Sequence, residues 1–225
     1  MQLESAIDHI VIAAQTLDQG QAWCEERLGA SPLPGGQHPL MGTHNRLLQI
    51  SSPECPQCYL EIIAIDPAAK PPRRPRWFGL DDAALQARLA STGPELVSYV
   101  ARSNQINTHR WALLAAHLQP GEVVTASRQT PNGLLEWQIA IPDDGRPLAG
   151  GAVPMLIQWQ GGHPADRLPE SGVGLTAITV RGMADIVAQG LKLQPITRAS
   201  RPGAALSAHF NTPKGTVTLH SHTGL

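Results

Sequence analysis

One order of secondary-structure elements, a strand, a helix and then three strands, can be read three times along this chain of 225 residues. The first copy opens with the apolar, β-branched stretch 8–14, continues with an amphipathic stretch at 15–30 that ends near a glycine, and closes with the apolar stretch 59–66. Apolar runs bounded by turn formers are typical of buried strands, whereas apolar residues at helical spacing indicate a helix. The sequence therefore predicts an α+β fold made of tandem βαβββ modules.

The second copy repeats this order over residues 94–160. Its expected helix, 107–118, carries Trp111, Leu114 and Leu118 on one apolar stripe. A Thr-Pro-Asn-Gly turn at 130–133 lies between two of its strands. Its four expected strands cover 94–102, 121–129, 134–141 and 153–160.

The third copy is weaker and follows a joint rich in glycine and proline at 161–173. Its expected elements are a strand at 174–180, a helix at 183–191 and strands at 196–201, 204–210 and 215–221. We therefore expect a first domain over 1–165, with modules at about 1–66 and 94–160, and a third module over 170–225. The third module is interpreted as a structural or dimerisation element, so a homodimer is one expected assembly.

The overall composition favours a small ligand over a macromolecular one. Seventeen basic and eighteen acidic residues nearly cancel, so no global field draws the chain to nucleic acid or to an anionic membrane. A hydrophobic content of 42% can supply a core, but no run is long enough to span a membrane and the N-terminus does not resemble a signal peptide. We expect a cytoplasmic protein.

Three cysteines do not suggest a disulfide framework, which agrees with a reducing compartment. Cys55 and Cys58 form a C-x-x-C pair that could be half a zinc site or a redox pair. Because no second pair exists and no helix follows, a proline-containing hairpin loop is the favoured interpretation.

The segment 67–78 holds four prolines and four lysines or arginines, so it is expected to be an extended connector. It ends in Trp77 and Phe78, whose exposure to water would be unfavourable. We expect these two rings to fix the connector against the fold or over the mouth of a pocket.

Two ionisable side chains lie in the middle of apolar strands of the first copy, His9 and Glu61. An ionisable group inside an apolar strand loses hydration that a partner must replace. His9 and Glu61 could compensate each other, or they could jointly bind a metal ion.

Four stretches of the sequence together resemble one known family. They are Asp-His-Ile-Val at 8–11, His-Pro-Leu-Met-Gly-Thr-His-Asn at 38–45, Tyr-Leu-Glu-Ile-Ile-Ala-Ile-Asp-Pro at 59–67 and Pro-Arg-Trp-Phe-Gly-Leu at 75–80. On these motifs the chain is similar to the vicinal-oxygen-chelate superfamily, which includes glyoxalase I and extradiol dioxygenases, and more narrowly to the bacterial glyoxalase-like domain proteins. The likeness runs from the start to roughly residue 165, and the third module resembles the same type more weakly.

This resemblance implies two modules whose sheets curl around a cleft that holds a divalent ion, Zn, Fe, Mn or Ni. The metal ligands would be His9 and Glu61, and Glu61 would also move a proton. The second module departs from the pattern, because Ser98 and Gln158 stand where a matching pair of ligands is expected. Two interpretations stay open: a metal-dependent lyase, isomerase or dioxygenase acting on a small oxygenated substrate, or a metal-free protein of the same fold that binds or sequesters a small molecule.

Further polar and aromatic residues are candidates for contact with the ligand. The histidines among them could equally hold their loops by hydrogen bonds, Arg128 could hold a carboxylate or face solvent, and Trp137 and Trp159 could be core or cleft wall. The histidines of the joint and the tail, His163, His209, His220 and His222, are expected mostly at the surface, although His220 occupies the place in the third copy that Glu61 has in the first. The expected substrate-binding residues are His38, His44, Asn45, Trp77, Arg128, Trp137 and Gln158.

Overall fold

The computed structural model describes residues 2–130 and 133–223 of the chain. Its first module has the predicted strand–helix–three-strand order. Helix α1 begins after Thr16, whose hydroxyl accepts a hydrogen bond from the Gln19 N–H, and ends at Gly29 in the left-handed conformation. The elements are β1 (Ser5–Ala13), α1 (Leu17–Leu28), β2 (Leu33–His38), β3 (Thr43–Gln49) and β4 (Tyr59–Ile65).

The second module repeats the order, as predicted, after helix α2 (Ala83–Ser91). Residues 131–132 of the expected turn between β6 and β7 lie outside the described part of the chain. The elements are β5 (Glu95–Ser103), α3 (Ile106–Ala115), β6 (Glu122–Thr130), β7 (Gly133–Ile141) and β8 (Met155–Gln160).

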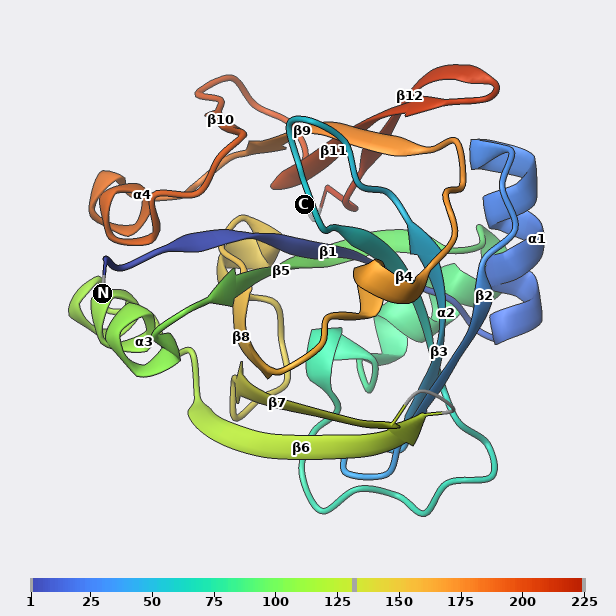
Figure 1. Cartoon of the computed structure of the whole chain (residues 1–225), viewed down its shortest axis with the longest axis horizontal. Helices are drawn as coiled ribbons and strands as arrows, with labels where there is room; N and C mark the ends of the chain where they lie inside the picture. The colour runs from blue at the N-terminus through green and yellow to red at the C-terminus, as the bar shows by residue number, and fades with distance from the viewer. Residues whose placement is uncertain (1, 131–132, 224–225) are drawn as a thin grey trace.

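The two modules share one curled sheet of eight strands in the order β2-β3-β4-β1-β5-β8-β7-β6 (Figure 1). In each module the first and fourth strands pair in parallel, and the modules join where β1 and β5 pair antiparallel. The edge strands β2 and β6 approach each other, so the sheet is nearly closed. The predicted α+β fold with paired βαβββ modules is confirmed, and the curled sheet turns one face toward an interior.

The edge strand β2 contains a proline and a bulge. It runs through Pro34 with a register irregularity before Gln37. An edge strand tolerates proline and a bulge because one side of it has no partner strand. Helix α3 buries Ile106, His109 and Leu113 and leaves Trp111 65% exposed, so the predicted apolar stripe through Trp111 is wrong.

The third unit also has the predicted element order, but its strands are arranged differently. Its sheet has the order β10-β9-β11-β12, so its first and last strands are separated by β11 instead of pairing. His220 on β12 therefore has no spatial equivalence to Glu61. The elements are β9 (Gly174–Val180), α4 (Asp185–Leu191), β10 (Ile196–Arg198), β11 (Leu206–Thr212) and β12 (Gly215–His220).

The third unit packs on the outer face of the large sheet (Figure 1). Leu206, Ala208 and Phe210 of β11 are buried in the same hydrophobic cluster as Ile10 and Ile12 of β1. This apolar face is therefore covered within the chain. The domain boundary near 165–170 and a dimerisation role for the tail stay predictions.

The connector before α2 is fixed by its two rings, as predicted. Trp77 is 5% exposed and Phe78 2%, in the short 3-10 helix η1 (Trp77–Gly79). Cys55 and Cys58 are buried free thiols in the loop between β3 and β4, which agrees with the loop interpretation. Within the described ranges, no helix combines the length and the apolar character that crossing a membrane requires.

Gly20 allows helix α1 to pack closely on β4. A Cβ at this position would lie 2.2 Å from Cγ2 of Ile62 and 3.1 Å from the Ala14 Cβ. We expect Gly20→Ala to lower the free energy of unfolding by about 2 kcal/mol, because overpacking a rigid core outweighs the gain in helix propensity. Urea denaturation checks this, with exposed Glu26→Ala in the same helix as the control. A more stable Gly20→Ala variant would contradict the tight helix–sheet contact.

Candidate functional site

A β-bulge in β1 places Asp8 and His9 together. Ile7 pairs with Ala101 and His9 pairs with Val100, so Asp8 is an extra residue without an opposite partner on β5. Successive side chains of a regular strand point to opposite faces, whereas a bulge can turn two neighbours toward the same side. The bulge brings the carboxylate of Asp8 within 2.7 Å of Nδ1 of His9.

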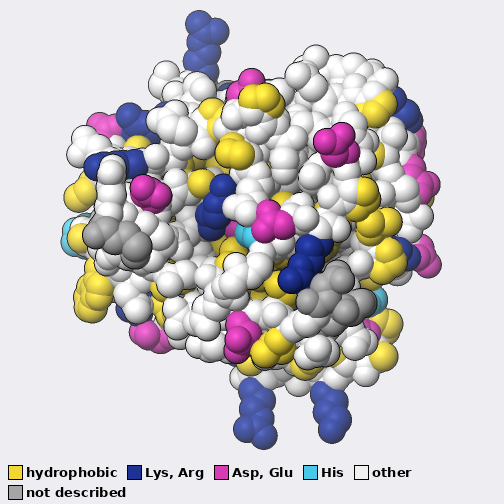
Figure 2. Space-filling model, in the orientation of Figure 1, with side chains coloured by type: hydrophobic (Ala, Val, Ile, Leu, Met, Phe, Trp, Pro, Cys, Tyr) yellow, Lys and Arg dark blue, Asp and Glu magenta, His cyan; other side chains and the backbone are white. Residues whose placement is uncertain are grey.

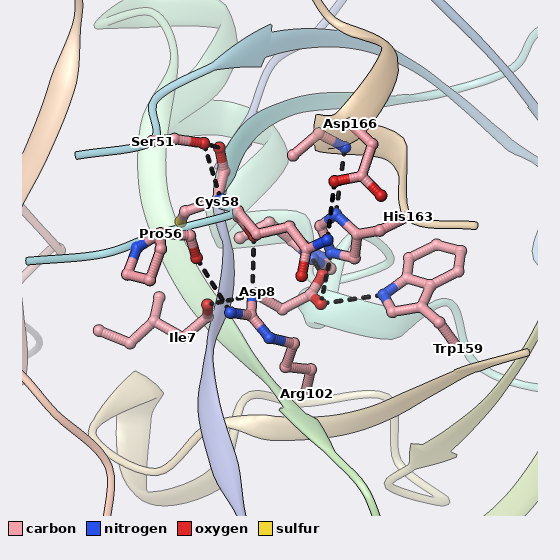
Figure 3. A network of polar contacts seen from close by, with 12 residues as sticks. Ile7, Asp8, Ser51, Pro56, Cys58, Arg102, Trp159, His163 and Asp166 are labelled. Atoms are coloured by element: carbon pink, nitrogen blue, oxygen red, sulfur yellow. Dashed lines mark hydrogen bonds and ion pairs between the residues drawn. The ribbon is translucent and has the colours of Figure 1, made fainter. Parts of the chain in front are cut away.

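Asp8 is fully buried and accepts hydrogen bonds from three side chains (Figure 3). His9 Nδ1 lies 2.7 Å from Oδ1, while His163 Nε2 and Trp159 Nε1 each lie 2.9 Å from Oδ2. Burial opposes ionisation of Asp8, but the bonds from His163 and His9 outweigh it and hold its pKa well below the usual range. Asp8 is therefore a buried carboxylate, and both histidines point an N–H toward it.

His163 was expected at the surface, and this prediction is wrong, because the side chain is only 4% exposed. It lies just before the 3-10 helix η3 (Pro164–Arg167), where its Nδ1 accepts the Ala165 N–H at 3.1 Å. Nε2 therefore carries the proton that is donated to Asp8. The sequence around His163 gives no local signal for this role, because its partner is 155 positions away.

Arg102 holds the backbone around the bulge in place (Figure 3). Its guanidinium donates to the carbonyls of Ile7 at 3.1 Å, Gln57 at 2.7 Å and Pro56 at 2.9 Å. The Gln57 side chain in turn donates to the Asp166 carboxylate at 2.7 Å. The loop between β3 and β4 and the joint after β8 are thereby fixed around Asp8.

The other ring nitrogen of His9 faces Glu61. Nε2 of His9 lies 3.5 Å from Oε2 of Glu61, and the imidazole stacks on the Tyr59 ring at a centroid distance of 4.5 Å. Both side chains are buried, at 3% and 5% exposure. With Nδ1–H donated to Asp8, Nε2 of His9 and the carboxylate of Glu61 face each other and can share one proton.

Asn45 orients Glu61 from the neighbouring strand β3. Its Nδ2 donates to Oε1 of Glu61 at 2.6 Å, and its Oδ1 accepts the Gly36 N–H at 2.7 Å. The amide is therefore held at both ends. This fixes the carboxylate of Glu61 toward the interior of the sheet.

His38 completes the polar group as a neutral imidazole. Its Nδ1 lies 3.1 Å from the Thr43 hydroxyl, and its Nε2 lies 3.4 Å from Nδ2 of Asn45. Burial lowers the pKa of His38 to about 4, and the positive charge of Arg128 contributes to this, whereas Glu61 opposes it.

These side chains line a small cavity inside the curled sheet, with a volume of about 30 Å³. Its polar end is formed by the first module together with Arg128 of β6, and its remaining wall is aromatic and aliphatic. A cavity of this size holds about one water molecule, so a larger ligand requires the wall to move. Histidine, acidic and basic side chains gather near the middle of the face seen in Figure 2. The lining residues are His9, His38, Asn45, Leu47, Tyr59, Glu61, Trp77, Phe78, Arg128, Trp137, Ile139, Ile157, Trp159 and Pro164.

Seven of the expected site residues meet at this cavity: His9, His38, Asn45, Glu61, Trp77, Arg128 and Trp137. Two others lie elsewhere. His44 alternates with Asn45 along β3 and is absent from the lining, and Gln158 accepts the Ile106 N–H at 2.8 Å and lines a different surface hollow. The site includes three residues that were not expected to take part, Asp8, Tyr59 and His163.

The donor set does not fit the divalent ion that the resemblance implies. His9 and Glu61 could provide two ligands, but the second module contributes apolar Ile157 from its fourth strand and Val100 opposite His9. Among residues 2–130 and 133–223, no three His, Cys, Asp or Glu side chains converge so as to hold a metal. A catalytic metal centre usually has three protein ligands.

A family model described as "Glyoxalase-like domain" matches residues 7–193 of the chain. The paired βαβββ modules and the curled sheet agree with this match. The chain therefore belongs to the glyoxalase-like domain family, within the vicinal-oxygen-chelate superfamily. No curated protein sequence matches it significantly.

One similar solved structure supports the fold. A hypothetical protein from Staphylococcus aureus is 15% identical with a TM-score of 0.54, and the match covers 97% of this chain and 87% of that one. A methylmalonyl-CoA epimerase from Streptomyces coelicolor, in complex with 2-nitronate-propionyl-CoA, is 16% identical with a TM-score of 0.43 over 70% of this chain and 96% of that one. The second likeness is too distant to carry an argument.

The tautomer of His9 depends on Asp8. We expect Asp8→Asn to lower the free energy of unfolding by about 2–3 kcal/mol, because an amide cannot accept from all three donors. We also expect the ¹⁵N NMR signals of the His9 ring to change, since Nδ1 loses the carboxylate that holds its proton. Exposed Asp143→Asn is the control. Unchanged His9 ring signals in Asp8→Asn would contradict the hydrogen bond from Nδ1–H of His9 to Asp8.

Burial of neutral His38 makes stability depend on pH. In the unfolded state His38 binds a proton near its ordinary pKa of 6.5, whereas in the folded state its pKa is about 4. The free energy of unfolding therefore falls as the pH drops from about 6.5 to 4, by at most about 3 kcal/mol from this group. Urea denaturation across this window should show a flatter dependence in His38→Gln, with His44→Gln as the control. Equal slopes in wild type and His38→Gln would refute this.

Proposed function

We propose that this glyoxalase-like protein binds a small oxygenated molecule in the cavity and that His9 and Glu61 transfer a proton on it. The reaction class would be an isomerisation or elimination that starts by removal of a proton next to a carbonyl group. Because the described residues of the cavity offer two ligands for a metal ion, the proposed reaction uses no metal ion in any step.

The observation that carries the proposal is the 3.5 Å separation between His9 Nε2 and Glu61 Oε2 at the polar end of the cavity. Two buried acceptors that face each other are stabilised when one proton lies between them. Such a pair can take up a proton from a bound molecule and return it. The ionised carboxylate of Asp8 supports this role because it stabilises a positive charge on His9.

The rest of the cavity supports the chemistry by excluding water. Asn45 keeps the Glu61 carboxylate in place, and the rings of Tyr59, Trp137 and Trp159 form apolar wall. Charges and hydrogen bonds act more strongly in such a site than in water. The same aromatic wall favours a second candidate function, in which the protein binds or sequesters a small molecule without changing it.

Proton exchange tests the proposal without knowledge of the natural substrate. Small carbonyl compounds, including hydroxyacetone, 2-oxo acids and the hemithioacetal of methylglyoxal, are incubated with the protein in D₂O, and ¹H NMR follows loss of the signal next to the carbonyl. We expect at least one compound to exchange faster than in buffer, and His9→Gln or Glu61→Gln to reduce the rate by about 10²–10⁴. Treatment with a chelator should leave the rate unchanged.

His44→Gln is the matched control, because His44 lies on β3 outside the cavity lining. Folding of each variant is checked by circular dichroism. Exchange that persists in both His9→Gln and Glu61→Gln would refute the proton-transfer role. Binding of a compound without exchange would favour the sequestering function.

A further inference from the structure

Within the described residues, Arg128 is a charged group of the cavity that has no carboxylate partner. Asp8 and Glu61 are each held by hydrogen-bond donors, whereas no carboxylate among the described residues lies within ion-pair distance of Arg128. Its Nη1 lies 3.5 Å from Oδ1 of Asn45, an oxygen that already accepts the Gly36 N–H. This contact is at the outer limit of a hydrogen bond and leaves most of the guanidinium available.

Gly36 on β2 leaves the space through which Arg128 reaches the cavity. Arg128 projects from the edge strand β6 toward the other edge strand, β2. A Cβ on Gly36 of β2 would lie 2.5 Å from Nη1 of Arg128 and 3.0 Å from its Cδ. A side chain at position 36 would therefore collide with the arginine. The absence of one gives a guanidinium from an edge strand a defined path to the cavity. This differs from an arginine on a solvated strand face, which needs no such space.

A second donor on the same cavity also lacks an acceptor. Trp77 lines the cavity and is 5% exposed, and its Nε1 is buried without a hydrogen-bond partner in the described part of the chain. A buried donor without a partner is unfavourable, because the hydration it has lost is not replaced. Trp77 thus presents a buried N–H without an acceptor, and half-buried Arg128 presents N–H groups without a carboxylate partner among the described residues. Oxygen acceptors would satisfy both.

We propose that the ligand of this cavity is a small monocarboxylate with an apolar body. Its carboxylate lies on the guanidinium of Arg128, Trp77 supplies a further N–H, and Phe78, Trp137 and Ile139 contact the body of the molecule. Because the cavity volume is only about 30 Å³, the aromatic wall must retreat to admit even a small ligand. This inference rests on the proposed function, because it names the class of molecule that occupies the same site.

Benzoate and its neutral isostere benzamide separate the effect of charge from that of shape. Isothermal titration calorimetry with the full chain should show benzoate binding about tenfold to hundredfold more tightly than benzamide. Arg128→Gln should abolish this preference, and Arg128→Lys should keep part of it because lysine retains the charge without the bidentate fork. Gly36→Ala, which displaces the guanidinium but leaves the charge, should weaken benzoate more than benzamide.

Equal affinities for the two probes in wild type, or a preference for benzoate that survives in Arg128→Gln, would overturn the proposal. Failure of benzoate to bind would overturn it as well. Melting temperatures confirm that each variant is folded, and Arg128→Lys covers the case in which Arg128→Gln does not fold. The proton-exchange assay remains the separate test of His9 and Glu61, so the two proposals can fail independently.

Discussion

The burial of the Asp8 carboxylate is the constraint on which the site depends. A charge removed from water must find its hydrogen-bond donors within the protein, and removing one partner of a buried ion pair costs about 3–5 kcal/mol. The donors to Asp8 come from the adjacent His9, from Trp159 on β8 and from His163 in the joint that follows. The polar end of the cavity therefore depends on segments of both modules and on the joint to the tail.

The two modules are equivalent in topology but unequal in chemistry. The first supplies His9, Glu61 and Asn45, while the second supplies Arg128 from β6 and apolar side chains from its own first and fourth strands. The result is a cavity with one polar end and one apolar wall, instead of a symmetric set of ligands around an ion. This asymmetry favours proton transfer on, or recognition of, an organic molecule over a metal centre of four protein ligands.

Local patterns predicted the elements well, because helix and strand periodicity is a property of neighbouring residues. β9 was predicted at its observed bounds, and most other strands within about two residues. The patterns were less informative where neighbours in space decide the outcome. Pro34 could continue β2 because that strand lies at the edge of the sheet. Helix α3 buried Leu113 instead of Trp111, because the helical spacing allows either residue on the buried face and packing decided between them.

The sequence by itself determined the repeated modules, the family and the presence of His9 and Glu61 on strands of one module. The tertiary structure decided what these residues can do. A bulge placed Asp8 beside His9, a joint far along the chain buried His163 against Asp8, and a glycine on β2 opened the path of Arg128. Each of these depends on contacts between segments distant in sequence, and such contacts leave no periodic signal in the local pattern.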